Sequence, residues 1–77
     1  MIEKKIIELV AEQFAVDADS LSRSTAFIDT LSADSLDIVE LTMSVEEEFS
    51  IPEVAEEDLQ KILTIGDLVD YVEGAIG

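Results

Sequence analysis

The stretch that says most about the fold is residues 34–49, which read DSLDIVELTMSVEEEF. Its apolar residues recur at helical spacing, so we expect a helix that begins near Ser35 and ends at about Phe49. At about 100° of rotation per residue, the apolar side chains fall on two nearly opposite faces of this helix. The inner stripe consists of Ile38, Leu41, Val45 and Phe49, and the outer stripe consists of Leu36, Val39 and Met43.

The outer stripe is more apolar surface than a small bundle needs, because a surface helix usually buries only one stripe. The outer stripe packs either on the long preceding connection or on partner proteins. The carboxylates interleaved with its apolar residues favour the binding of partner proteins. Apolar anchors would supply affinity, while carboxylates would steer basic proteins to the helix. We expect a docking face made of Asp34, Leu36, Asp37, Val39, Glu40, Met43, Glu46 and Glu47.

The rest of the chain also favours helices. Apolar spacing predicts an amphipathic helix over residues 2–15 and a short helix around residues 56–62. Thr64 is the expected N-cap of a last helix, with Asp67 as its capping-box partner. Residues 16–34 lose the period but keep large apolar side chains, which indicates a loop pinned to the core. We therefore predict one all-α domain over residues 1–77, a small four-helix bundle with three longer helices, one short helix and a long first loop.

Charge is the strongest compositional feature of the chain. Its 77 residues include four basic and nineteen acidic ones, a formal net charge of −15. No Lys or Arg lies between Arg23 and Lys61, and 48% of the residues are hydrophobic, which favours a folded acidic domain over disorder. Nucleic acid and anionic membranes would repel such a chain, whereas basic protein surfaces would attract it.

The chain has no cysteine and no histidine, so it offers no disulfide, no thiolate metal site and no imidazole base. Its longest apolar run is too short to span a membrane, and its first residues do not resemble a signal peptide. We expect a cytoplasmic monomer that holds no metal and inserts into no membrane.

Ser35 is the candidate functional residue. A Ser or Asp in front of an apolar-periodic run is usually a helix N-cap. Nucleophilic catalysis by Ser35 is disfavoured because the chain has no histidine to act as its base. Ser35 could instead accept a group from another enzyme, so we expect a protein that is not itself an enzyme.

These residues resemble a known family. Asp34-Ser35-Leu36, within Leu31–Asp37, is similar to the phosphopantetheine attachment motif of acyl carrier proteins, and Val39–Phe49 is similar to the acidic recognition helix of that family. The resemblance covers essentially the whole chain. Further matching positions are Glu12-Gln13-Phe14, Val16, Ile51-Pro52, Lys61-Ile62, Thr64 and Asp70-Tyr71-Val72.

The resemblance implies that a holo-acyl-carrier-protein synthase transfers 4′-phosphopantetheine from coenzyme A to Ser35. The terminal thiol of this arm would hold acyl groups as thioesters and present them to basic-surfaced enzymes of fatty acid biosynthesis. The helices would also shelter the acyl chain. For that pocket we expect Leu41, Val45, Ile62 and Leu63. The chain departs from the family at Ser32, where Gly is common, and in segment 50–58. The resemblance therefore does not predict the backbone conformation at either place.

Three other readings compete with a fatty-acid carrier. A carrier for a polyketide or another specialised acyl or aminoacyl pathway would share the motif. An unmodified acidic adaptor that binds basic proteins would explain the charge and the two-faced helix, but it leaves Ser35 without a function. A calcium-binding loop could begin at Asp17-Ala18-Asp19, yet Leu21 and Ser22 stand where an acidic ligand and a glycine are required.

Overall fold

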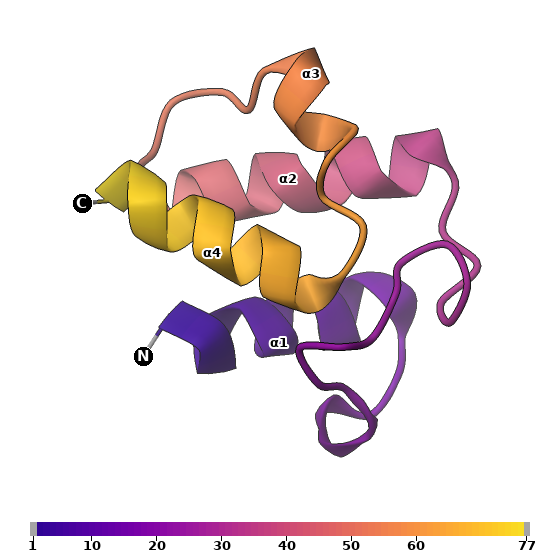
Figure 1. The fold of residues 1–77 in the computed structure, drawn as a ribbon. Coiled ribbons are helices and arrows are strands. Elements are labelled where there is room, and N and C mark those ends of the chain that lie inside the picture. The colour runs from indigo at the N-terminus through magenta and orange to yellow at the C-terminus, as the bar shows by residue number, and fades with distance from the viewer. Residues whose placement is uncertain (1, 77) are drawn as a thin grey trace.

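The computed structural model describes residues 2–76, which form four α-helices and one short 3₁₀ turn (Figure 1). The three longer helices lie alongside one another, and the short helix α3 is set apart from them (Figure 1). The predicted all-α bundle of three longer helices and one short helix is confirmed. The elements are α1 (Ile2–Phe14), η1 (Ala18–Ser20), α2 (Ser35–Phe49), α3 (Glu56–Leu59) and α4 (Ile65–Ile76).

The core forms where α1 contacts both α2 and α4. Each helix turns one apolar stripe inward, as helical periodicity dictates, and the long connections add further side chains to the same cluster. No helix within residues 2–76 is long and apolar enough to cross a membrane. The fully buried side chains of the core are Ile6, Val10, Phe27, Leu41, Val45, Ile65, Leu68, Val69 and Val72.

The connection between α1 and α2 is pinned to the core, as its apolar residues predicted. Phe27 and Ala33 are buried, whereas Ile28 is an exception with 60% of its surface exposed. The Phe27 N–H donates to the Leu63 carbonyl at 3.0 Å, and residues Ala26 and Thr64 form an isolated β-bridge. These contacts tie the first connection to the residues just before α4. The turn η1 was not predicted, because its three residues carry no helical periodicity.

Arg23, in the same connection, forms ion pairs with two helices. Its guanidinium donates to Glu3 of α1 at 2.9 Å and to Asp70 of α4 at 2.6 Å. Hydrogen bonds with Glu3 and then Asp70 raise the pKa of Arg23 above its usual range. The Gly66 N–H donates to the Arg23 carbonyl at 2.8 Å, and a Cβ on Gly66 would lie 3.0 Å from that oxygen. A Cβ at position 66 would thus be in tight contact with the Arg23 backbone, and glycine avoids this contact.

The third helix is shorter than predicted. The sequence indicated residues 56–62, but α3 ends at Leu59. The next residues form a tighter turn, in which the Ile62 N–H donates to the Leu59 carbonyl at 3.2 Å. This turn ends with Ile62, which is buried in the core.

The start of α4 is confirmed as predicted. The Asp67 N–H donates to the Thr64 hydroxyl at 3.2 Å, and the Thr64 N–H donates to the Asp67 carboxylate at 3.2 Å. Both bonds satisfy N–H groups that the helix itself leaves unpaired.

Candidate functional site

The N-cap of α2 is Asp34, not Ser35. The Asp37 N–H donates to the Asp34 carboxylate at 2.9 Å, and the Asp34 N–H donates to the Asp37 carboxylate at 3.2 Å, which completes a capping box. Ser35 is therefore the first helical residue. It is exposed, and its hydroxyl forms no hydrogen bond with residues 2–76. The capping role that a serine here would ordinarily fill is thus already taken.

The turn that precedes Ser35 is defined by the backbone conformation of Ser32 and by a hydrogen bond of Ala33. Ser32 adopts a left-handed backbone conformation with φ of 55°, which a residue with a side chain rarely takes. Next to it, Ala33 is buried and its N–H donates to the Phe27 carbonyl at 3.0 Å. Ser32 stands where the resemblance implies that glycine is common, and the left-handed turn forms without glycine.

A cavity of about 230 Å³ lies between the first connection, α2 and the α3–α4 connection. Ile38 lines it, and because Ile38 follows Ser35 by three residues, the two lie on neighbouring positions of the helix surface. The wall is largely apolar. Its residues are Ala26, Phe27, Ile28, Asp29, Ile38, Ile62 and Leu63.

The four expected pocket residues divide between this cavity and the core. Ile62 and Leu63 line the cavity, whereas Leu41 and Val45 do not and are fully buried. Leu41 and Val45 belong to the inner stripe of α2, which packs in the bundle core. Ile28 and Ile38 line the cavity but were not expected there. Ile28 stands in a loop without periodicity, and no sequence signal marks it.

The outer stripe of α2 is open to solvent. Leu36, Met43 and Val39 are 64%, 54% and 39% exposed, so the first connection does not cover them. The inner stripe is buried or half-buried, as the helical projection predicted. One helix therefore serves the core with one side and presents an apolar strip on the other.

The carboxylates around the outer stripe differ in what they contact. Glu40 accepts a hydrogen bond from the Gln13 side chain at 3.2 Å, and Glu46 accepts one from the Val54 N–H at 2.8 Å. Glu47 is exposed and has no contact of this kind within residues 2–76. Asp34 and Asp37 are occupied by the capping box. The sequence predicted the acidic rim but not which of its carboxylates form hydrogen bonds within the protein.

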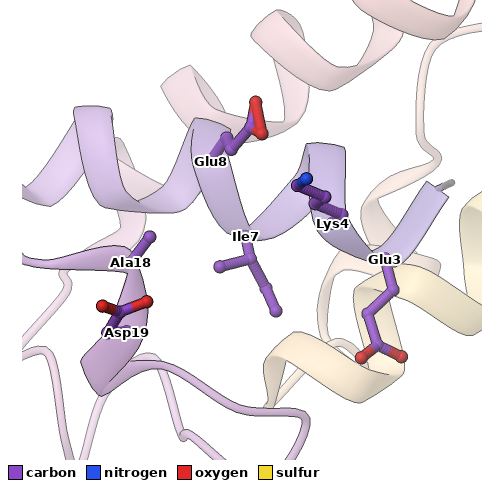
Figure 2. Close-up of a pocket in the computed structure, with 6 residues that line it drawn as sticks. All are labelled: Glu3, Lys4, Ile7, Glu8, Ala18 and Asp19. Carbon is purple, nitrogen blue, oxygen red and sulfur yellow. The ribbon is translucent and has the colours of Figure 1, made fainter.

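A second hollow, of about 430 Å³, lies between α1 and η1 (Figure 2). Ile7 forms its apolar part, and the charged side chains of Glu3, Lys4 and Asp19 border it (Figure 2). None of its lining residues belongs to α2 or to the turn before Ser35. The hollow therefore contributes nothing to the site around Ser35.

A helical bundle that presents an uncommitted serine at the start of an acidic helix, beside an apolar cavity, has the features of a carrier domain. The sequence pattern of the family described as "Phosphopantetheine attachment site" matches residues 4–72. The chain is 44% identical over 73 residues to the acyl carrier protein of Clostridium acetobutylicum, covering 95% of this chain and 94% of that protein. The chain belongs to the acyl carrier protein family.

The fold agrees with this assignment. A solved structure of the acyl carrier protein from Enterococcus faecalis superimposes with a TM-score of 0.80 at 31% identity, covering 96% of this chain and 92% of that one. The protein is an acyl carrier, and its cofactor is 4′-phosphopantetheine. The structure offers a fitting attachment point, since Ser35 is exposed with its hydroxyl uncommitted and the cavity lies beside the same helix turn.

Proposed function

We propose that Ser35 is the residue that receives 4′-phosphopantetheine, and that the protein serves fatty acid biosynthesis in the cytoplasm. The observation that carries this proposal is the capping box. Because Asp34 caps α2, the exposed Ser35 hydroxyl is left without a structural partner at the N-terminus of the helix. The protein itself catalyses nothing in this scheme, and other enzymes act on it.

The start of α2 suits the attached group. The bound arm supplies a terminal thiol that holds an acyl group as a thioester, and this chain has no cysteine of its own. A phosphate ester on Ser35 would lie at the positive end of the helix dipole, near backbone N–H groups of the first turn. The Asp34 carboxylate opposes a second negative charge there, but its hydrogen bond to the Asp37 N–H directs it to the cap.

The outer stripe and its acidic rim support docking of basic enzymes on α2, among them a holo-acyl-carrier-protein synthase. Exposed apolar residues such as Leu36 and Met43 would anchor the partner, while carboxylates such as Glu47 would guide its approach. Lys and Arg are absent between Arg23 and Lys61, so no cation of the chain lies on α2 to oppose a basic partner.

The cavity beside Ser35 is the proposed shelter for the acyl chain. Ile38, Ile62 and Leu63 would form its first wall, because they already line the space. Leu41 and Val45 would be reached only if the bundle core opened. Loading the arm with an octanoyl group and recording methyl NMR spectra separates these cases. We expect the largest shifts at Ile38 and Ile62; shifts centred on Leu41 and Val45 would place the chain inside the core.

The attachment itself is tested with coenzyme A and a phosphopantetheinyl transferase. We expect a mass gain of one phosphopantetheine, abolished by Ser35→Ala and retained by Ser32→Ala, a nearby exposed serine. If several transferases of fatty acid systems give no gain, the unmodified adaptor is the better description. Native mass spectrometry of protein from its own source would identify the acyl groups and separate a fatty acid carrier from a polyketide carrier.

A further inference from the structure

Segment 50–55, which joins α2 to α3, is hydrogen-bonded to α2 through a single residue, Glu46. Three hydrogen bonds join the two within residues 2–76, and all three are accepted by Glu46. The Ser50 and Ile51 N–H groups donate to the Glu46 carbonyl, the latter at 3.1 Å. The Val54 N–H donates to the Glu46 carboxylate at 2.8 Å.

The side-chain bond satisfies a backbone N–H that lies in the protein interior. Val54 is 5% exposed and belongs to the core, so its N–H needs an acceptor within the protein. Ser50 lies in the left-handed region with φ of 53°, and the N-cap of the four-residue helix α3 is Ala55, which provides no side-chain hydrogen bond. A helix of one turn is not stable by itself, so α3 depends on its tertiary contacts, among them the anchoring of Val54 and the packing of Leu59 against the core.

Glu46 also borders the docking face. It follows Met43 by three residues and Val39 by seven, so all three lie on the same side of α2. Glu46 is only half-buried, so part of the residue is open to solvent. Glu46 thus holds the Val54 amide and also borders the surface on which basic partners would dock.

We propose that Glu46 couples docking on α2 to release of segment 50–59, an inference that rests on the proposed docking of basic partners. A partner lysine or arginine that pairs with the Glu46 carboxylate withdraws it from the Val54 N–H. A charged partner forms a stronger hydrogen bond with the carboxylate than a neutral amide does. Segment 50–59 then loosens, and because Ile62 is bonded back to Leu59, the loosening reaches the wall of the cavity.

Two substitutions of Glu46 separate its charge from its hydrogen bond. Glu46→Gln keeps an oxygen that can accept from Val54 but offers no charge to a cation, whereas Glu46→Ala removes both. Glu47→Gln is the matched control, because it removes a neighbouring charge that holds no backbone group. The readout is amide exchange at Val54, measured with and without saturating holo-acyl-carrier-protein synthase and in the absence of coenzyme A, so that no transfer occurs.

We expect Val54 exchange in the wild type to be slow in the free protein and at least about tenfold faster in the complex, a change worth about 1.4 kcal/mol. Glu46→Gln should stay slow in both states, Glu46→Ala should be fast in both, and Glu47→Gln should follow the wild type. Equal protection of Val54 in free and bound wild type, with shifts at Leu36 and Met43 proving that the complex formed, would overturn the coupling. Absence of those shifts would instead remove the docking face, and the coupling with it.

Discussion

Helices α2 and α4 are both amphipathic and acidic, yet they use their apolar residues differently. Of the twelve residues of α4, Ile65, Leu68, Val69 and Val72 are buried in one stripe, and only the terminal Ile76 is a large exposed apolar residue. The fifteen residues of α2 bury Leu41 and Val45 but expose a second stripe on the opposite side. The fold buries the apolar stripe of α4 but only one of the two apolar stripes of α2. Surface that does not serve the fold is available for partners.

The sharpest test of this comparison is one substitution made on both helices. Leu68 of α4 is fully buried, so Leu68→Ala should lower the free energy of unfolding by about 2–5 kcal/mol. Leu36 of α2 is 64% exposed, so Leu36→Ala should change it by less than about 0.5 kcal/mol. Urea denaturation of both variants measures the difference. Similar losses would show that the outer stripe is part of the structure after all.

The second test compares the two helices by activity instead of stability, and here the larger effect is expected on α2. Met43→Ala, in the outer stripe, should lower kcat/KM of the synthase for this protein by roughly tenfold, because it removes an anchor worth about 1–2 kcal/mol. Ile76→Ala removes a comparably exposed side chain from α4 and should leave that rate unchanged. Assays at several concentrations of the carrier protein give the values. An equal loss in both variants would mean that docking is not confined to α2.

The third test compares charge on the two helices. Glu47 of α2 and Glu73 of α4 are both exposed glutamates. Glu47→Lys should slow association with a basic partner several-fold and weaken its dependence on salt, since charges at an interface act mainly on the on-rate. Glu73→Lys changes the net charge equally and should have a much smaller effect. Stopped-flow binding at two ionic strengths distinguishes local steering from an effect of total charge.

The sequence predicted what local periodicity controls. The limits of α2, the capping of α4 by Thr64 and Asp67, and both stripes of α2 follow from helical spacing and capping chemistry. The prediction failed where distant residues decide. The end of α3 depends on a turn that brings Ile62 to the core, and the bond from Val54 to Glu46 joins residues whose spacing carries no pattern. The cavity likewise combines three segments that only the fold brings together.

The smallest expected effects concern backbone conformation at the approach to α2 and within α4. Ser32 occupies the left-handed region, which costs about 1–2 kcal/mol for a residue with a Cβ, and the greater freedom of glycine when unfolded offsets part of any gain. Ser32→Gly should therefore raise the free energy of unfolding by about 0.5 kcal/mol. Gly74 lies inside α4 with open space around it, so Gly74→Ala should raise it by up to about 1 kcal/mol.

Thermal melts of these two variants measure stability, and the transferase assay on the same samples measures function. Neither substitution changes residues 34–36 or the capping box, so the rate of phosphopantetheine transfer should equal that of the wild type. A Ser32→Gly protein that is more stable but modified more slowly would contradict this expectation. The strained turn would then be a functional part of the site, because it would be needed to hold Ser35 in the orientation that the synthase accepts.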